Sequence, residues 1–426
     1  MVFKYFYLGL ISIFKLLFLI LLWFFKGLIE VVLFIPKYFI KGVIFLFKGK
    51  WEKAWIKDRI QYASDKRIHL YESMWEGYID KTEHMPKSLF KFFPFNHNSL
   101  KCIENNSVFM NNPSNFNDPF DCLLCANENE FLKYCLLDYL KETDAIGRGI
   151  LSRDELNKLE YSFCGDWEPH SGSIYNTFDS VVTHICYDPE LRKERKGSDE
   201  ISRKLYHDRI KYEKGLKELR KNTMQVTSFA NINDFKLTCY MELWAHYAQN
   251  HEGFCVEYDL TKPIADSREN AMILGGLLPC EYGAKQIILS KRKIYKYINK
   301  IPLTTYEQME LDKSLMLSFI TKSLSWKYEN EWRLLLPVDI CKIYDNMIPF
   351  FPIKAIYIGC RMPRDNREYL YCLAKRKDIK VYDMSMHEYN FELEGEYCET
   401  NINNYFQLKE EKRQKELRDS RYKFWE

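Results

Sequence analysis

Residues 322–333 read KSLSWKYENEWR and continue into the apolar sequence LLLP at 334–337. From Trp326 onward, large apolar side chains alternate with charged ones, which is the two-residue period of a β-strand. Such a strand has two faces, one with Trp326, Tyr328, Asn330, Trp332 and Leu334, the other with Lys327, Glu329, Glu331 and Arg333. The pattern predicts a sheet that contains residues 326–336, with two carboxylates side by side on one face.

The neighbouring carboxylates of Glu329 and Glu331 allow two interpretations. Two carboxylates at positions i and i+2 of one strand face can orient a polyhydroxy substrate, while one of them stabilises a developing positive charge. Alternatively, the face lies in solvent and forms salt bridges with Lys327 and Arg333, each of which stabilises a fold by only about 0–1 kcal/mol. The spacing alone slightly favours the solvent-exposed face.

The sequence around this strand predicts an α+β domain. Further strand-like patterns occur at 225–230, 253–260, 354–360 and 380–384. Helical spacing occurs at 130–160, and 188–222 mixes both charge signs, as a solvated pair of helices would. We therefore predict, for residues 86–400, a mixed or antiparallel sheet core with helical insertions. A charged helix or tail is expected at 401–426.

A polar loop at 114–121, with the sequence SNFNDPFD, carries the first candidate binding groups. Asn and Asp before Pro favour a fixed turn. Phe116 and Phe120 are expected to anchor this turn in the core. Asp118 and Asp121 then project from a rigid loop, where binding groups are often found. The alternative is a purely structural turn that an Asn or Asp side chain caps.

A second polar cluster follows the TSFA sequence at 227–230. In the helical sequence ELWAHYA, the spacing predicts that Trp244 lies in the core. His246 and Tyr247 point elsewhere and can meet a ligand, although a histidine in such a helix is more often a structural group. Gly253 then lets the chain enter the next strand without a side chain in the way.

The N-terminus predicts a membrane element. Residues 5–25 are apolar apart from Lys15, and a run of this length can cross a hydrocarbon layer of about 30 Å. A second apolar run, 31–47, is a weaker spanning candidate. Lysines recur every eleven residues, at positions 4, 15, 26, 37 and 48, which aligns them in one stripe of a helix.

Three interpretations of the lysine stripe remain open. The helix lies in the headgroup layer with its lysines reaching the phosphates. Alternatively, one or two spans carry lysines that are paired or face the interior of a homo-oligomer. The third interpretation is chance spacing in a lysine-flanked span. All three hold residues 1–50 at a lipid membrane, followed by an amphipathic juxtamembrane helix at 51–85.

Charge and cysteine content restrict the function classes. Residues 1–50 carry seven lysines and one glutamate, a net charge of +6, whereas the whole chain carries +3. The positive excess therefore belongs to the apolar N-terminus, which argues against a chain-wide nucleic-acid-binding charge. Thirteen cysteines without regular spacing indicate a reducing compartment, so the main domain is expected in the cytoplasm.

Several common enzyme motifs are absent from the sequence. It contains no P-loop, GxSxG, HExxH or dinucleotide-binding glycine fingerprint, which disfavours conventional ATPases, serine hydrolases and Rossmann dehydrogenases. Cys122 and Cys125 have the spacing of a zinc knuckle, but no second pair follows at a matching distance. We therefore predict no metal site.

The motifs in their order resemble one family. They are KFF at 91–93, FNDPFD at 116–121, SF at 228–229, W-x-H-Y-A at 244–248 and W-x-x-E-x-E-W-R at 326–333. This series resembles the bacterial domain-of-unknown-function family numbered 2971, over about residues 85–385. The resemblance implies a bacterial protein, and the apolar N-terminus, which lies outside the family pattern, adds the expectation of the inner membrane with the main domain in the cytoplasm. It implies no activity.

A looser resemblance bears on mechanism. An E-x-E sequence on a late strand, after a serine-bearing strand and an N-terminal polar strand, is similar to ADP-ribosyltransferase-like folds. In those enzymes the second glutamate holds the nicotinamide ribose of NAD and stabilises an oxocarbenium-like transition state. The resemblance assigns this role to Glu331, an accessory role to Glu329 and the middle serine to Ser228.

These arguments predict one site and three classes of function. The expected catalytic residues are Glu331, Glu329 and His246, and the expected NAD-binding residues are Ser228, Asn117, Asp118, Asp121 and Tyr247. The leading hypothesis is a membrane-anchored, NAD-dependent ADP-ribosyltransferase-like effector in toxin or phage-defence biology, acting on a protein or nucleic-acid target. The first alternative is a non-enzymatic sensor or membrane-perturbing effector, whose soluble domain binds a ligand or partner and controls the N-terminal helices. The second is a metal-dependent nuclease using the same carboxylates.

Overall fold

The computed structural model describes residues 81–144, 198–232 and 240–398, with scattered positions between 55 and 157 and between 407 and 413. The chain divides into two compact units, Met1–Asp58 and Arg59–Glu426, and the fold below belongs to the second. The predicted membrane segment, residues 1–50, lies outside the described residues, as do most of the predicted juxtamembrane helix and C-terminal tail. Within the described part, none of the helices is long and apolar enough to cross a bilayer.

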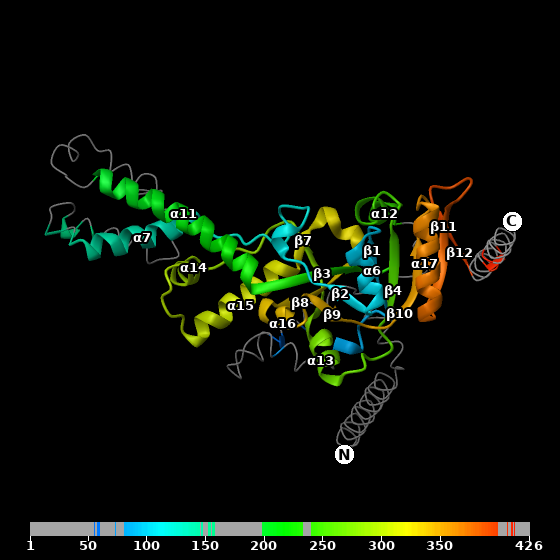
Figure 1. The fold of residues 1–426 in the computed structure, drawn as a ribbon. Helices are drawn as coiled ribbons and strands as arrows, with labels where there is room; N and C mark the ends of the chain where they lie inside the picture. The colour runs from blue at the N-terminus through cyan, green and yellow to red at the C-terminus, as the bar shows by residue number, and fades with distance from the viewer. Residues whose placement is uncertain are drawn as a thin grey trace, which may run out of the picture. The chain divides into compact units, whose positions relative to one another are not determined.

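A mixed, mostly antiparallel sheet forms the core of the second unit (Figure 1). Within the described residues it has eight strands in the order β12-β11-β10-β4-β1-β3-β8-β5. Among the described strand pairs of this sheet, β10–β11 is the parallel one. The strands are β1 Ser88–Phe93, β3 Met224–Ala230, β4 Phe254–Asp259, β5 Leu277–Pro279, β8 Glu331–Pro337, β10 Ile353–Ile358, β11 Lys380–Met386 and β12 Leu393–Tyr397. This architecture confirms the predicted α+β class.

Two small strand pairs and a set of helices complete the unit. The pairs are β2 (Ser107–Phe109) with β9 (Met347–Pro349), and β6 (Glu281–Gly283) with β7 (Thr321–Ser323). The helices are α6 His97–Glu104, α7 Glu128–Glu142, α11 Ser198–Thr223, α12 Met241–Tyr247, α13 Ser267–Gly276, α14 Lys291–Ile298, α15 Thr305–Ile320, α16 Val338–Ile343 and α17 Arg364–Lys377. Two short 3₁₀ helices are η1 (Pro113–Asn115) and η3 (Leu324–Glu329).

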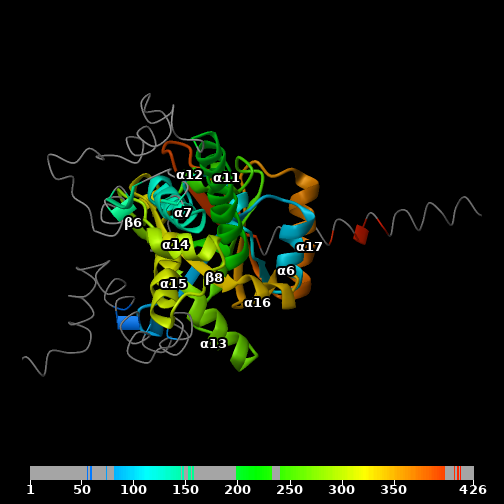
Figure 2. The ribbon, with the colours of Figure 1, turned by 90° about the vertical axis from the view of Figure 1, so that its left-hand side faces the viewer.

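Helices pack on both faces of the sheet. Because successive strand residues point to opposite sides, Phe92 and Phe93 bury their rings on different faces. Phe92 meets Trp244 of α12 edge to face at 5.2 Å, and Phe93 stacks on Phe254 of β4. On the Phe93 side, α6 and α17 lie side by side (Figure 2), and Tyr369 of α17 donates a hydrogen bond to α6. As predicted, Trp244 is fully buried.

A helical insertion packs beside the sheet. Helices α7, α11 and α14 are held together by an aromatic group in which Phe131 contacts Tyr212 and Tyr295 at 5.1 and 6.0 Å. The sequence predicted a pair of helices at 188–222. Residues 188–197 lie outside the described part, and 198–222 belong to one helix, α11, which continues through Gly215.

The strand predicted at 326–336 is wrong in its first half. The chain forms the 3₁₀ helix η3, and the strand β8 begins only at Glu331. Asn330 reverses the chain between them in the left-handed conformation, with φ 44° and ψ 54°. Asparagine tolerates this region better than most residues, and the amide of Asn330 donates to the carbonyl of Asn231 at 2.6 Å. The predicted two-faced alternation therefore holds only after Asn330.

Gly253 lies directly before β4, at a point where the chain passes close to the end of β1. A Cβ atom at Gly253 would lie 2.1 Å from the carbonyl oxygen of Phe93. Replacing Gly253 with alanine is therefore expected to lower the free energy of unfolding by about 1–3 kcal/mol, because backbone must move. The matched control is Gly283→Ala, whose nearest neighbour lies at 3.6 Å. Equal urea-unfolding midpoints for the two variants would contradict this expectation.

Candidate functional site

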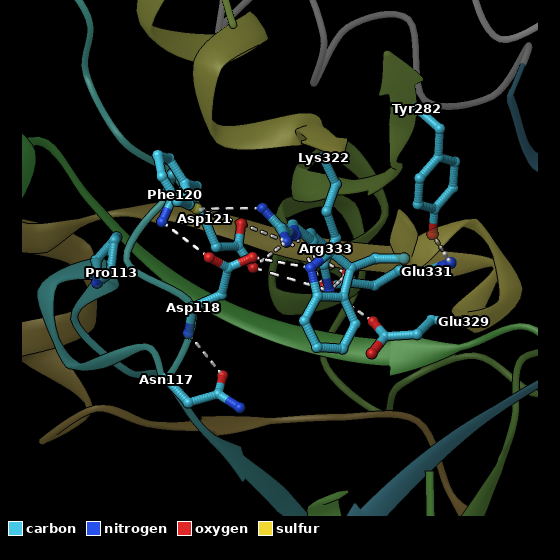
Figure 3. Close-up of polar contacts among 12 residues, drawn as sticks. Pro113, Asn117, Asp118, Phe120, Asp121, Tyr282, Lys322, Glu329, Glu331 and Arg333 are labelled. Atoms are coloured by element: carbon cyan, nitrogen blue, oxygen red, sulfur yellow. Dashed lines mark hydrogen bonds and ion pairs between the residues drawn. The ribbon is translucent and has the colours of Figure 1, made fainter. Parts of the chain in front are cut away.

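Five charged side chains form a buried cluster beside the start of β8 (Figure 3). Lys322 Nζ lies 2.5 Å from Glu329 Oε2 and 2.8 Å from Glu331 Oε2. Arg333 Nε lies 2.8 Å from Glu331 Oε1, and its Nη2 lies 2.7 Å from Asp121 Oδ1. All five side chains are at most 8% exposed. The cluster is thus an internal network of ion pairs, named here the ion cluster.

Local structure explains how distant residues reach the ion cluster. A capping box between Thr304 and Glu307 starts α15, which runs without a break into β7 and so presents Lys322. The reversal at Asn330 then folds Glu329 back toward Lys322. The two carboxylates therefore meet around one lysine, although only Glu331 belongs to a strand.

Burial and charge move the acidities of the two carboxyl groups in opposite directions. Burial raises the pKa of Glu329, and the neighbouring charge of Glu331 raises it further, while Lys322 only partly offsets this. Burial also favours protonation of Glu331, but the guanidinium of Arg333 and the ammonium of Lys322 outweigh it and hold the pKa of Glu331 well below its usual range. Two carboxyl groups with separated pKa values are a typical arrangement for acid–base work.

Tyr247 connects α12 to this site. Its hydroxyl donates a hydrogen bond of 2.9 Å to Glu329 Oε1. Since a donor stabilises the ionised carboxylate, we expect Tyr247→Phe to raise the pKa of Glu329 by about one unit more. The folded state then holds this proton to higher pH than the unfolded state, so stability falls with rising pH across the interval. Carboxyl ¹³C titration, assigned with Glu329→Gln, measures the shift; an unchanged titration would contradict the role of the hydroxyl.

A cavity of about 690 Å³ opens beside the ion cluster. It lies where β1 and β3 separate, since these strands pair only at Phe90 and Ala230. Beyond that point Val226 of β3 pairs with Asn111 instead. Lining residues come from both strands, the 109–121 segment, α12 and the ion cluster, and they include Lys91, Asn117, Asp121, Ser228, His246, Tyr247, Lys322, Glu329 and Glu331. We call this space the first cavity.

Lys91 is a cation in the wall of the first cavity. Its Nζ donates to the carbonyl of Ser228 at 3.0 Å and lies over the rings of Phe93 and Phe229 at 5.5 and 5.4 Å. Burial lowers the pKa of Lys91 to about 8. Among the described residues, no carboxylate lies within ion-pair distance of this ammonium group. The charge of Glu331 acts on Lys91 without forming an ion pair and offsets the effect of burial only in part, so an anionic ligand in the cavity would supply a direct counter-charge.

The polar loop at 114–121 is a capped turn, and its two aspartates contact the protein itself. Asp118 Oδ1 accepts from the amide of Phe120 at 2.9 Å, and Asp118 Oδ2 accepts from the indole of Trp326 at 2.8 Å. Asp121 pairs with Arg333. The prediction that Phe120 anchors the turn in the core is wrong, since this side chain is 67% exposed. The pairing of Asp121 with Arg333 holds the loop in its place.

The structure brings most of the predicted site residues to one place. Seven of them line the first cavity: Glu331, Glu329, His246, Ser228, Asn117, Asp121 and Tyr247. Asp118 does not line it and lies beside a second cavity. The predicted solvent face is wrong, because Glu331 and Arg333 are buried and the shared cation is Lys322 rather than the exposed Lys327.

Sequence reasoning missed Lys322, Arg333 and Lys91 as parts of the site. Lys322 gives no periodic signal, because it lies in β7, seven residues before Glu329, and the 3₁₀ helix η3 begins between them. Arg333 had a weak signal, since it follows Glu331 at the i+2 spacing of one strand face. In the described residues, no group of three or more His, Cys, Asp or Glu side chains is placed to hold a metal ion.

Part of the chain is similar to a known family. Residues 243–334 match the family described as a protein of unknown function, DUF2971, as the motifs predicted. Strands β1 and β3 and the 114–121 loop lie outside the matched residues, yet they build the same site. No curated protein and no solved structure matches the chain.

Proposed function

We propose, from the premise that residues 243–334 belong to the DUF2971 family, that the first cavity binds NAD and that the site breaks the bond between nicotinamide and ribose. One observation carries this proposal. The three adjacent strands β1, β3 and β8 bring Lys91, Ser228 and Glu331 to one cavity. In the resemblance to ADP-ribosyltransferases, β1 and β3 take the places of the polar and serine-bearing strands, and β8 carries the second glutamate of the E-x-E sequence, while Glu329 lies in η3.

The charges around the first cavity suit a cation-forming reaction on an anionic substrate. Breaking an N-glycosidic bond leaves an oxocarbenium-like centre, which a nearby ionised carboxylate stabilises. Glu331 keeps its negative charge because Arg333 and Lys322 hold its pKa low. The NAD diphosphate would supply the anion that Lys91 lacks among the described residues. Ser228 would form a hydrogen bond with the nicotinamide ribose of NAD.

The cellular role in this proposal follows from the sequence. Residues 1–50 would hold the enzyme on the bacterial inner membrane and could associate into a homo-oligomer through their lysine-striped helices. The catalytic unit would face the cytoplasm and modify a host or phage target there. Depletion of NAD, or transfer of ADP-ribose from NAD to a target, would make the protein a toxin or a phage-defence effector.

The test is NAD turnover by the full-length protein in detergent or lipid vesicles. We expect release of nicotinamide, and Lys91→Met should raise the NAD concentration at half-saturation about tenfold, because a charge-assisted contact of about 1.4 kcal/mol is lost. Lys327→Met, an exposed change outside the cavity lining, is the matched control. A folded wild-type protein that neither binds nor consumes NAD would overturn the proposal.

One observation favours a second candidate, a ligand sensor without catalysis. Both oxygens of Glu331 already accept from cations, which is also how a purely structural carboxylate looks. In this proposal the first cavity binds the ligand, and binding controls the N-terminal helices. NAD that binds with no release of nicotinamide, together with cell toxicity that Glu331→Ala retains and deletion of residues 1–50 removes, would support the sensor.

A further inference from the structure

A second cavity of about 870 Å³ adjoins the first. Its lining comes from the 117–123 part of the polar loop, the 283–287 loop, the end of α15, β7 and the start of η3. Asn117, His246 and Lys322 line both cavities. The two spaces therefore meet at a shared wall, and a group bound in one can approach a group bound in the other.

The shared wall is held in place by Trp326. Its indole nitrogen donates to Asp118 at 2.8 Å, and the ammonium of Lys322 lies 5.0 Å from its ring centre. The ring of His246 stands edge-on to Trp326, with 6.1 Å between centroids. His246 is thereby positioned between the cavities, and among the described residues it belongs neither to the ion cluster nor to another salt bridge. Figure 3 shows Asp118 on the loop next to the ion cluster.

The chemistry of the second cavity suits a polypeptide. Hydroxyl and amide side chains dominate its polar lining, at Asn117, Gln286, Ser318, Thr321, Ser323 and Ser325. Among the described lining residues, Lys285 is the one cation outside the ion cluster and His246, too little for the phosphate backbone of a nucleic acid. Phe120, an exposed apolar side chain, lies in the lining. Leu324, which precedes the lining residue Ser325 in sequence, is also exposed. Apolar anchors with hydrogen-bonding groups are typical of protein recognition.

We infer that the second cavity receives a nucleophilic side chain of a polypeptide, which accepts ADP-ribose from NAD in the first cavity. This inference rests on the proposed function. In the reaction, the nucleophilic atom of the acceptor forms a bond to the ribose carbon. The bond from that carbon to the pyridinium nitrogen breaks, and its electron pair leaves with neutral nicotinamide. The proton of the acceptor group passes to the imidazole of His246.

The experiment separates acceptor binding from NAD cleavage. Full-length protein is incubated with adenylate-labelled NAD and a bacterial lysate, and two quantities are measured: total nicotinamide release and the ratio of macromolecule-bound label to free ADP-ribose. Ala284→Trp fills the second cavity from a loop that does not line the first. We expect this ratio to fall at least tenfold, with total release within twofold of wild type, because water replaces the acceptor. Ala284→Ser is the matched control.

A second plug variant, Ser325→Trp, fills the same cavity with a side chain from η3. It keeps the test valid if the first plug variant, Ala284→Trp, does not fold. The label on macromolecules should be removed by protease and resist nuclease. An unchanged ratio in both folded plug variants, an equal loss of nicotinamide release, or label that nuclease removes would each overturn the inference while leaving the proposed function standing. No nicotinamide release from wild-type protein would overturn both.

Discussion

Replacing Arg333 with methionine is expected to lower the free energy of unfolding by about 3–5 kcal/mol, because removing one partner of a buried ion pair leaves charge without compensation. Arg333 is fully buried and contacts Glu331 and Asp121. It also donates to the carbonyl of Phe319 at 2.6 Å. Methionine fills much of the volume, so the loss reports charge and hydrogen bonding more than a cavity.

Equilibrium urea unfolding of the full-length protein, followed by tryptophan fluorescence, measures this loss. The control is Arg364→Met, since Arg364 forms an exposed pair with Glu368 and should change stability by less than about 1 kcal/mol. Adding Glu331→Gln to Arg333→Met removes the unpaired charge. The double variant should therefore recover about 1 kcal/mol or more relative to the sum of the single changes. Strict additivity would show that Arg333 and Glu331 do not stabilise each other.

Replacing Glu331 with glutamine is expected to lower nicotinamide release by about 10²–10³-fold, the usual effect of removing a group that stabilises transition-state charge. The amide keeps the size of the side chain but loses the charge that Arg333 and Lys322 maintain. The maximal rate should fall much more than NAD affinity, because the developing positive charge exists only in the transition state.

The control for this experiment is Glu396→Gln, an exposed change on the edge strand β12. The folded fraction of each variant is measured by thermal unfolding, so that a rate loss is not confused with misfolding. Turnover within threefold of wild type from folded Glu331→Gln would assign Glu331 a structural role. In that case the same assay with Glu329→Gln shows whether the carboxyl with the raised pKa carries the reaction.

Local patterns predicted part of the framework that carries the site, because a strand or helix depends on near neighbours in sequence. Gln225, for example, begins a predicted strand that β3 contains, and the helix predicted to carry His246 and Tyr247 is α12, from which both residues line the first cavity. Gly253 was expected at the entry to a strand for lack of space, and its contact with Phe93 confirms this. Periodicity and steric argument suffice for such features.

Features that depend on chain reversal or on distant partners could not be predicted in the same way. In the sequence, the alternation of apolar and polar residues continues through Asn330. In the structure, the left-handed conformation of Asn330 ends η3, and β8 starts after it. The partners of Glu331 come from β7 and from within β8, and the partner of Arg333 comes from the 114–121 loop, more than two hundred residues away. No sequence period encodes such contacts, since tertiary packing selects them.

The contact between Asp121 and Arg333 also bears on how such genes recombine. The family-matched segment, residues 243–334, supplies Arg333, whereas Asp121 lies upstream of it. A gene exchange that carries the segment alone would bring an inward-facing guanidinium into a chain whose loop must already offer a carboxylate. In unmatched hybrids Arg333 would keep Glu331 but lose Asp121, one of its two carboxylate partners, and the fold would be less stable. Viable crossovers should therefore transfer the loop and the segment together, so the unit of inheritance is larger than the unit that sequence matching detects.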